Sequence, residues 1–474
     1  MTIAEQRDAF LAGSATAVDA VDTALQRIDA QTSLNAFISV FPERARIRAD
    51  ALDQRRNAGA CGPLAGTVLG IKDLINVQGE ATTCGSHILE GYTSPFDATV
   101  IERLEAADAI IVGKCNMDEF AMGSSNETSY FGPVQNPRNT DHVPGGSSGG
   151  SVAAVAADLV PAALGSDTGG SIRQPAAFCG VVGMKPTYGR ISRYGLVAYA
   201  SSLDQIGPIT HSVHDNARLL GVIAGHDPRD STSVDVPVPD YTASLNQDVK
   251  GLTIGVPEEY RGEGLDAEIA GRLDALLEQL QQAGANIVSC SLPHTKYCIA
   301  TYYIIAPAEA SSNLSRFDGV RYGYRADEGT TLSSMFVESR SQGFGPEVQR
   351  RIMLGTYVLS AGYYDAYYQK ARKVRRLIKE DFDRAFTDCD CLITPVAPTT
   401  APKFGEMMSN PLQMYLADIY TTSVNLAGLP GLSVPCGTAT DNLPIGFQIL
   451  GKHFDESMLY RVGHYIEQHC APAL

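Results

Sequence analysis

Short apolar runs alternate with amphipathic stretches along this chain of 474 residues. Residues 67–71 and 109–112 read as buried strands, and residues 99–107 between them have the apolar spacing of a helix. The same order of strand, helix and strand returns over residues 252–288. Strands that alternate with helices in this way are typical of parallel β–α–β units. The alternation therefore predicts an α/β fold.

No internal repeat or low-complexity linker divides the chain. We therefore expect residues 61–474 to form the main α/β domain, continuous with a helical lead over residues 1–60. Within the lead, Thr2 and Thr16 each precede an acidic residue at capping-box spacing, which predicts two helices. Later segments predict two more helices and three core strands, over residues 372–386, 456–468, 392–394, 432–434 and 445–450.

Acidic side chains outnumber basic ones, 53 against 37, which gives a net charge of -16. This balance opposes nonspecific binding to nucleic acid or to anionic membranes. The ten cysteines form no C-x-x-C pair, so neither a zinc ribbon nor a dithiol redox motif is indicated, and we expect a reducing compartment. No window reaches the roughly 18 apolar residues of a membrane helix, and the first residues lack the basic start of a signal peptide. These features predict a cytoplasmic protein.

Two serine clusters flanked by glycines lie close together in the middle of the chain. They occupy residues 145–151 and 167–171, and each leads into a stretch with helical character. Glycine tolerates positive φ and leaves neighbouring N–H groups open, as an oxyanion hole beside a nucleophilic serine requires. A flexible turn is the simpler interpretation of one such cluster. Two clusters so close together favour a catalytic site.

The clusters leave open which serine would attack. Residues 145–149 match the G-x-S-x-G pattern, which would make Ser147 the nucleophile with a histidine downstream. The nine histidines, however, show no spacing typical of a triad, and His211 and His214 read as ordinary polar positions. Residues 167–169 are similar to an aspartic-protease loop, but that mechanism needs a second such triplet, which the sequence lacks. No P-loop pattern is present either.

A serine nucleophile without a histidine needs another base, and Lys72 is the candidate. It follows the apolar run of residues 68–71, where a strand would carry it into the interior. The simpler alternative is a strand-end lysine that reaches solvent. To act as a base the amine must be neutral, so burial must lower its pKa from about 10.4 to about 7.

At these residues the sequence resembles the amidase signature family. The resemblance implies an α/β fold with one large central mixed β-sheet covered on both faces by helices. It implies that Ser171 attacks an amide carbonyl, while Ser147, preceded by a cis peptide, relays the proton to Lys72. It also implies that the oxyanion is held by three backbone N–H groups, those of Thr168, Gly169 and Gly170.

Three further runs resemble the tRNA-dependent amidotransferase branch of that family, and they cover residues 123–129, 166–190 and 201–208. In this branch the amidase component takes ammonia from free glutamine. The resemblance implies that Tyr302 lies near the reacting amide, Arg351 binds the α-carboxylate and Asp418 binds the α-ammonium. A zwitterion needs one fixed cation and one fixed anion, which agrees with this assignment. The neighbouring Tyr303 and Arg350 leave a shift by one position open.

The resemblance also implies a heterotrimer with the B and C subunits of an amidotransferase. The B subunit would use ATP and magnesium to activate misacylated glutamyl- or aspartyl-tRNA, and ammonia would reach it through a channel, while the C subunit forms a small belt. We therefore expect no metal or cofactor in this chain, no membrane contact, and tRNA bound mainly through the B subunit. The basic run of residues 370–379 then reads as a solvated helix face rather than an RNA contact.

Three simpler alternatives stay open. Arg351 and Asp418 could belong to surface salt bridges. A stand-alone amidase of the same family would act on other small carboxamides and would not depend on these two residues. A catalytically silent scaffold would leave Ser171 unlabelled by an acyl-trapping reagent.

Overall fold

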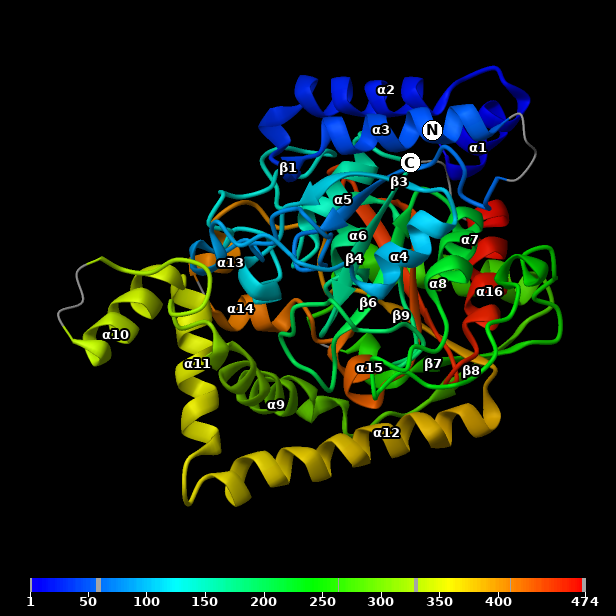
Figure 1. Ribbon diagram of the computed structural model, residues 1–474. Helices are drawn as coiled ribbons and strands as arrows, with labels where there is room; N and C mark the ends of the chain where they lie inside the picture. The colour runs from blue at the N-terminus through cyan, green and yellow to red at the C-terminus, as the bar shows by residue number, and fades with distance from the viewer. Residues whose placement is uncertain (1, 57–60, 263, 328–330, 410, 471–474) are drawn as a thin grey trace.

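The computed structural model describes residues 2–56, 61–262, 264–327, 331–409 and 411–470, in which eleven strands form one mixed sheet (Figure 1). In chain order the strands are β1 (Phe37–Val40), β2 (Val68–Lys72), β3 (Ile110–Cys115), β4 (Ala162–Asp167), β5 (Val182–Lys185), β6 (Gln205–Thr210), β7 (Thr253–Pro257), β8 (Asn286–Cys290), β9 (Cys391–Pro395), β10 (Gly431–Thr438) and β11 (Pro444–Leu450). Across the sheet their order is β1-β3-β2-β4-β6-β5-β10-β11-β9-β7-β8. The mixed sheet expected from the family resemblance is confirmed.

Parallel pairs lie toward both edges of the sheet, and antiparallel pairs lie between them. Strand β2 runs parallel to β3 and to β4, and β7 runs parallel to β8 and to β9. From β4 through β6, β5, β10 and β11 to β9 every pairing is antiparallel. The two predicted β–α–β segments are therefore confirmed as the two parallel regions.

Helices surround the sheet, and sixteen α-helices are present in the described part of the chain. They are α1 (Ile3–Ala12), α2 (Ala17–Ala30), α3 (Pro42–Arg56), α4 (Thr99–Ala106), α5 (Gly149–Ala156), α6 (Arg173–Cys179), α7 (Val213–Ile223), α8 (Ala267–Gln282), α9 (Cys298–Asn313), α10 (Leu332–Gly343), α11 (Pro346–Leu359), α12 (Lys370–Asp388), α13 (Glu406–Ser409), α14 (Pro411–Leu416), α15 (Thr422–Ala427) and α16 (Glu456–His469). In the described residues, no helix combines the length and apolar character needed to cross a membrane.

The two faces of the sheet bury two separate apolar cores, because neighbouring strand residues point to opposite sides. In β2, Val68 packs with helices α2, α3 and α5, whereas Leu69 and Ile71 belong to the larger core on the other face. In β3, Ile110 and Ile111 divide in the same way. All five residues of β2 are buried, which explains their nearly continuous apolar sequence.

The first sixty residues hold more structure than two helices. Both predicted capping boxes are present, at Thr2 and at Thr16. A third helix, α3, follows them, and β1 pairs antiparallel with β3 at the edge of the sheet. The domain division at residue 60 stays a prediction, and residues 57–60 lie outside the described residues.

Helices α9 to α12 form a second region, on the side of the molecule opposite α1 to α3 in Figure 1. Helix α11 packs along α9, and α12 packs against both α9 and α15. A π-helical turn, η8 (Tyr364–Gln369), leads directly into α12. This region brings residues from 298 onward close to the carboxyl ends of β2 and β4, where the serine clusters lie.

Candidate active site

Lys72 and the two serine clusters meet at one edge of the sheet. Lys72 is the last residue of β2, and Asp167 is the last residue of β4. Because β2 and β4 are parallel neighbours, their carboxyl ends lie side by side. The first cluster leads into α5 and the second into α6, so both loops lie over this edge. The sheet topology therefore explains why distant motifs converge.

The amine of Lys72 is fully buried among serine hydroxyls. Its Nζ lies 2.8 Å from Ser147 Oγ, 2.9 Å from Ser148 Oγ and 3.0 Å from Ser166 Oγ. The Gly146–Ser147 peptide is cis, as the family resemblance implies. The alternative of a solvent-exposed strand-end lysine is therefore wrong.

Burial lowers the pKa of Lys72 to about 7, because a charged amine loses its hydration in the interior. Three buried carboxylates oppose this shift and favour the charged amine, those of Asp118, Asp167 and Asp204. The loss of hydration outweighs them. A neutral lysine is thus accessible near pH 7, as a general base requires.

Ser171 lies in the loop between β4 and α6 and is 7% exposed. Its carbonyl accepts the N–H of Ser148 at 3.2 Å, which ties the two serine clusters together. Its hydroxyl forms no hydrogen bond with any described residue, so it is free to meet a substrate. The structure therefore brings Lys72, Ser147 and Ser171 to one place.

The carboxylate of Asp167 holds the loop that carries Ser171. It accepts the N–H of Gly170 at 2.9 Å and of Ile172 at 3.2 Å, and Arg173 Nε lies 3.1 Å away. Burial opposes ionisation of Asp167, but the Arg173 guanidinium prevails and lowers its pKa to about 2. Asp167 is therefore charged at neutral pH and fixes the loop from beneath.

This arrangement changes the set of candidate oxyanion donors. The N–H of Gly170 is occupied by Asp167, which the spacing of the motif does not reveal. The N–H groups of Thr168 and Gly169 meet no acceptor within the described chain. Thr168 is held through its side chain, whose Oγ1 donates to Asp204 Oδ1 at 2.7 Å. Two of the three expected donors are thus open.

Tyr302 and Asp418 lie directly against this loop. Tyr302 comes from α9, and its ring packs so closely on Gly169 that a Cβ there would lie 2.8 Å from Tyr302 Oη. A Cβ on Gly170 would lie 3.1 Å from Asp418 Oδ1. An aromatic hydroxyl and a carboxylate therefore flank the open backbone donors.

Asp418 is 6% exposed and half-satisfied. Ser124 Oγ donates to its Oδ2 at 2.5 Å, whereas its Oδ1 has no partner in the described chain. Burial raises the pKa of Asp418 to about 7. A buried carboxylate oxygen without a donor fits an incoming cation such as an ammonium group.

Arg351 extends from α11 and is buried, at 3% exposure. Its Nε donates to Glu347 Oε1 at 2.8 Å, and its Nη1 donates to Tyr199 Oη at 2.8 Å. The guanidinium also lies 5.2 Å from the centre of the Tyr303 ring. The neighbouring Arg350 is half exposed and pairs with the other oxygen of Glu347. The geometry favours Arg351 over Arg350, because only the former reaches the interior.

Residues 19–460 match the profile of the family described as Amidase. The chain belongs to the amidase signature family. It is 59% identical over 459 residues, 96% of either chain, to the A subunit of glutamyl-tRNA(Gln) amidotransferase from Acidobacterium capsulatum. It is 56% identical to the protein of the same name from Alkalilimnicola ehrlichii, over 98% of this chain and 96% of that one.

Solved structures of the amidase signature family have the same architecture. The crystal structure of the A subunit of glutamyl-tRNA(Gln) amidotransferase from Thermotoga maritima is 44% identical, with a TM-score of 0.80 over 96% of this chain and 92% of that chain. The peptide amidase from Stenotrophomonas maltophilia is 30% identical, with a TM-score of 0.83 over 100% and 98% of the two chains. The family's fold is thus shared by proteins named for different substrates.

Several residues that hold this amidase signature site were missed by sequence reasoning. Asp167 and Ser124 lie inside the motifs that carry the family resemblance, but their contacts could not be read from spacing. Glu347 lies four residues before Arg351, which is a detectable helical ion-pair spacing. Tyr199 and Asp204 come from a loop without a charge pattern. In the described residues, no group of three or more His, Cys, Asp or Glu side chains is arranged to hold a metal.

Proposed function

We propose that this chain is the glutamine-hydrolysing amidase subunit of a tRNA-dependent amidotransferase. The relatives at 56–59% identity carry that name over nearly their whole length. The observation that carries the substrate assignment is the pair of opposite charges beside the serine loop. Buried Arg351 and half-satisfied Asp418 flank Tyr302 and the open N–H groups, and together they complement a zwitterion with a neutral amide between its charges.

The reaction begins when Ser171 Oγ bonds to the side-chain amide carbon of glutamine. Its proton passes through Ser147 to the neutral Nζ of Lys72, 2.8 Å from Ser147 Oγ. The carbonyl oxygen becomes an oxyanion, which accepts hydrogen bonds from the N–H groups of Thr168 and Gly169. These groups are fixed before substrate arrives, so little reorganisation opposes the step.

The proton then returns along the same path to the amide nitrogen, the carbon–nitrogen bond breaks, and ammonia leaves. The remaining glutamyl ester on Ser171 is attacked by water, whose proton again reaches Lys72 through Ser147. Collapse of the second intermediate releases glutamate and restores the serine. With a pKa of about 7, about half of the Lys72 amines are neutral at pH 7, against about one in 10³ for an ordinary lysine.

We further propose that ammonia from this chain serves transamidation of Glu-tRNA(Gln) or Asp-tRNA(Asn) on a separate B subunit. ATP and magnesium would be used there, and a C subunit would complete a heterotrimer in the cytoplasm. The relatives are named as one lettered component of an amidotransferase, which supports a multi-subunit complex. The acidic balance of this chain agrees with tRNA binding mainly through a partner.

Ammonia release from glutamine tests the proposal, with the chain alone and then with the B and C subunits, ATP and misacylated tRNA. Replacing Ser171 by Ala should abolish release, while Ser151→Ala, a buried serine in the same segment that donates to Leu164 O, should retain it. Retained activity in Ser171→Ala would overturn the nucleophile assignment.

A stand-alone amidase is the second candidate, and the likeness to a peptide amidase favours it. In that case purified chain would cleave simple carboxamides faster than glutamine and would ignore the B and C subunits. Changes at Arg351 and Asp418 would then leave the KM for glutamine unaltered.

A further inference from the structure

A basic cavity lies beside α12, away from the serine loop. Its volume is about 600 Å³, and it is enclosed by α9, α12, the end of α15 and the loops around residues 188, 202 and 453. Four cationic side chains of α12 line it: Arg372, Arg375, Arg376 and Lys379. In a chain with a net charge of -16, such a concentration of positive charge in one hollow needs an explanation. The expectation of a purely solvated helix face is therefore incomplete.

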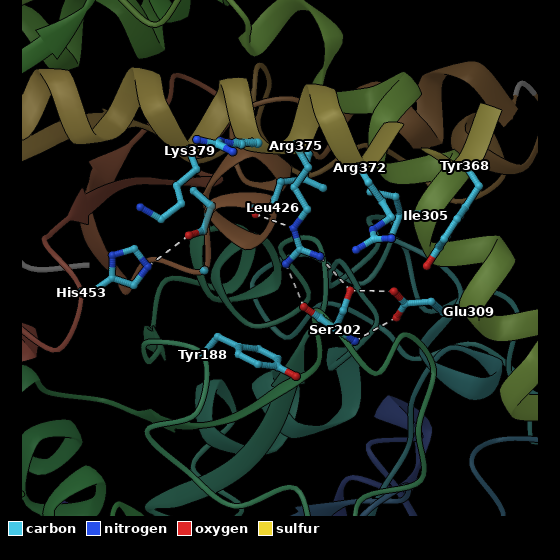
Figure 2. Close-up of a pocket in the computed structure, with 13 residues that line it drawn as sticks. Tyr188, Ser202, Ile305, Glu309, Tyr368, Arg372, Arg375, Lys379, Leu426 and His453 are labelled. Carbon is cyan, nitrogen blue, oxygen red and sulfur yellow. Dashed lines mark hydrogen bonds between the residues drawn. The ribbon is translucent and has the colours of Figure 1, made fainter. Parts of the chain in front are cut away.

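One of these cations is consumed by the structure itself. Arg375 donates to Leu426 O at 2.8 Å, to Ser202 Oγ at 2.8 Å and to Ser202 O at 2.9 Å, as Figure 2 shows. His453 contacts Ala427 O at 3.2 Å in the same way. These two groups satisfy carbonyls at the end of α15, so they account for the floor of the cavity but not for its rim.

The other three cations remain available for a ligand. Arg372 has no hydrogen-bond or ion-pair partner in the described chain, and Figure 2 shows it pointing from α12 toward the cavity. Arg376 and Lys379 pair only with Glu380 and Asp383 on their own helix, and their side chains are 82% and 43% exposed. Exposed pairs of this kind are weak, so a ligand can replace them.

The spacing of these three cations indicates the shape of the anion. Residues 372, 376 and 379 are separated by four and three positions, so they follow one face of the helix. With a rise of about 1.5 Å per residue, they span about 10 Å. A single carboxylate or phosphate would meet one or two of them, whereas a chain of phosphate groups would meet all three.

The remaining walls suit the uncharged part of such a ligand. Ile305 and Leu426 are apolar, and the rings of Tyr188 and Tyr368 stand on different sides of the cavity. The volume lies within the range of about 300–1,000 Å³ that small-molecule sites occupy. Among the described residues that line the cavity, Glu309 is the one carboxylate. It is satisfied by the N–H and Oγ of Ser202, at 2.8 Å and 2.7 Å.

The same floor leads to the amidase centre through one short loop, residues 199–204. Ser202 is held by Arg375 and Glu309 on the cavity side. Three residues earlier, Tyr199 Oη accepts from Arg351 at 2.8 Å, and two residues later, Asp204 accepts from Thr168 at 2.7 Å. A polyphosphate that draws Arg375 away from Ser202 would therefore act on residues at both ends of the substrate site.

We propose that this cavity binds a polyphosphate group, free or carried by a nucleoside, and that its occupation is coupled to glutamine binding through the loop 199–204. The binding half stands by itself, whereas the coupling half rests on the proposed glutamine site. A cavity with three cations on one short face favours a small ligand over a long RNA, which would need a continuous basic stripe.

Calorimetric titration of the full chain with inorganic tripolyphosphate tests the binding half. The double variant Arg372→Ala/Lys379→Ala should bind at least about tenfold more weakly, because both removed groups point into the cavity. The matched control is Lys370→Ala/Lys373→Ala, which removes the same charge from exposed positions on the same helix and should bind as the parent does. Equal loss in both variants, or no binding by the parent at millimolar concentration, would overturn the site.

Two further titrations identify the source of the phosphate. ATP that binds more tightly than tripolyphosphate would assign the tyrosine walls to a nucleoside, and equal affinities would assign the site to inorganic polyphosphate. A single-stranded RNA oligonucleotide that binds in a manner dependent on Arg372, while tripolyphosphate does not bind, would overturn the small-ligand proposal.

The coupling half is tested in the Ser171→Ala background, where glutamine binds without being consumed. Saturating tripolyphosphate should change the Kd of glutamine by about fivefold or more, and glutamine should change the Kd of tripolyphosphate by the same factor. Binding of both ligands without mutual effect would overturn the coupling and leave the site intact. If glutamine fails to bind at all, the proposed function fails while the polyphosphate titration still stands.

Discussion

The reaction centre at the strand ends and the helical region α9–α12 are built by different means. Around Lys72 and Asp167 the polar atoms are buried and bound to one another, and the supporting residues lie within short, dense motifs. Helices α9 and α11 instead each contribute one principal buried side chain, Tyr302 or Arg351, while their outer faces carry exposed apolar residues such as Met353, at 66% exposure. The chemistry is thus held rigidly by the sheet, and the choice of substrate is left to a few side chains on helices.

The largest effect should come from the rigid centre. Replacing Lys72 by Met should lower kcat by at least about 10³-fold, because no other described base replaces the buried amine. Ammonia release measures this loss, and Lys373→Met, an exposed lysine of α12, should have no effect. The parent enzyme should also lose kcat as the pH falls through about 7, since a protonated Lys72 cannot accept a proton. An unchanged profile at acidic pH would contradict its role as base.

The boundary between the two regions is tested at Gly169. A Cβ there would lie 2.8 Å from Tyr302, so Gly169→Ala should push the ring and the oxyanion donors apart. We expect about a 10²-fold loss of activity and a decrease of about 1–3 kcal/mol in the free energy of unfolding. Gly271→Ala on α8, where a Cβ meets nothing within 4 Å, should instead stabilise the protein by up to about 1 kcal/mol. Denaturant unfolding and ammonia release distinguish these outcomes.

A smaller and more selective effect is expected within the helical region. Arg351→Lys keeps the charge but loses the planar fork that reaches Glu347 and Tyr199. The KM for glutamine should rise by about 10–100-fold with a smaller change in kcat. Arg350→Lys should leave the KM nearly unaltered, because Arg350 is half exposed. The reverse result would shift the assignment by one residue.

The smallest effect is a pH dependence of binding. Asp418 must be ionised to bind an ammonium group, and its pKa lies at about 7. Glutamine should therefore bind about tenfold more weakly at pH 6 than at pH 8 in the Ser171→Ala background. Calorimetry at the two pH values measures this change, and Asp418→Asn should bind weakly at both. A pH-independent Kd would separate Asp418 from the ammonium.

The same contrast explains which features could be predicted from the sequence. The strands and helices with strong periodicity, among them β2, α8 and α12, lie within a few residues of their expected bounds. Strands β4 and β5 escape prediction, because β4 ends in the glycine-rich sequence Gly165–Asp167 and β5 has only four residues. Burial on both faces of a central sheet, not local propensity, makes these segments strands.

The catalytic candidates could be found from residue types because Ser, Gly and Lys recur in tight clusters. Arg351 and Asp418 could be found only through the family resemblance, since one arginine on a helix carries no local signal. The occupied N–H of Gly170 could not be foreseen at all. It depends on the direction in which the Asp167 side chain turns, which the fold decides.

The carboxylate of Asp167 serves amides at positions 170 and 172 and a guanidinium at position 173. One side chain therefore measures the length of the loop like a template, and an insertion between residues 167 and 173 would leave a buried charge with too few donors. Helices α9 and α11 have no such template. New amide substrates are accordingly more accessible to evolution or engineering through these helices than through the loop that performs the reaction.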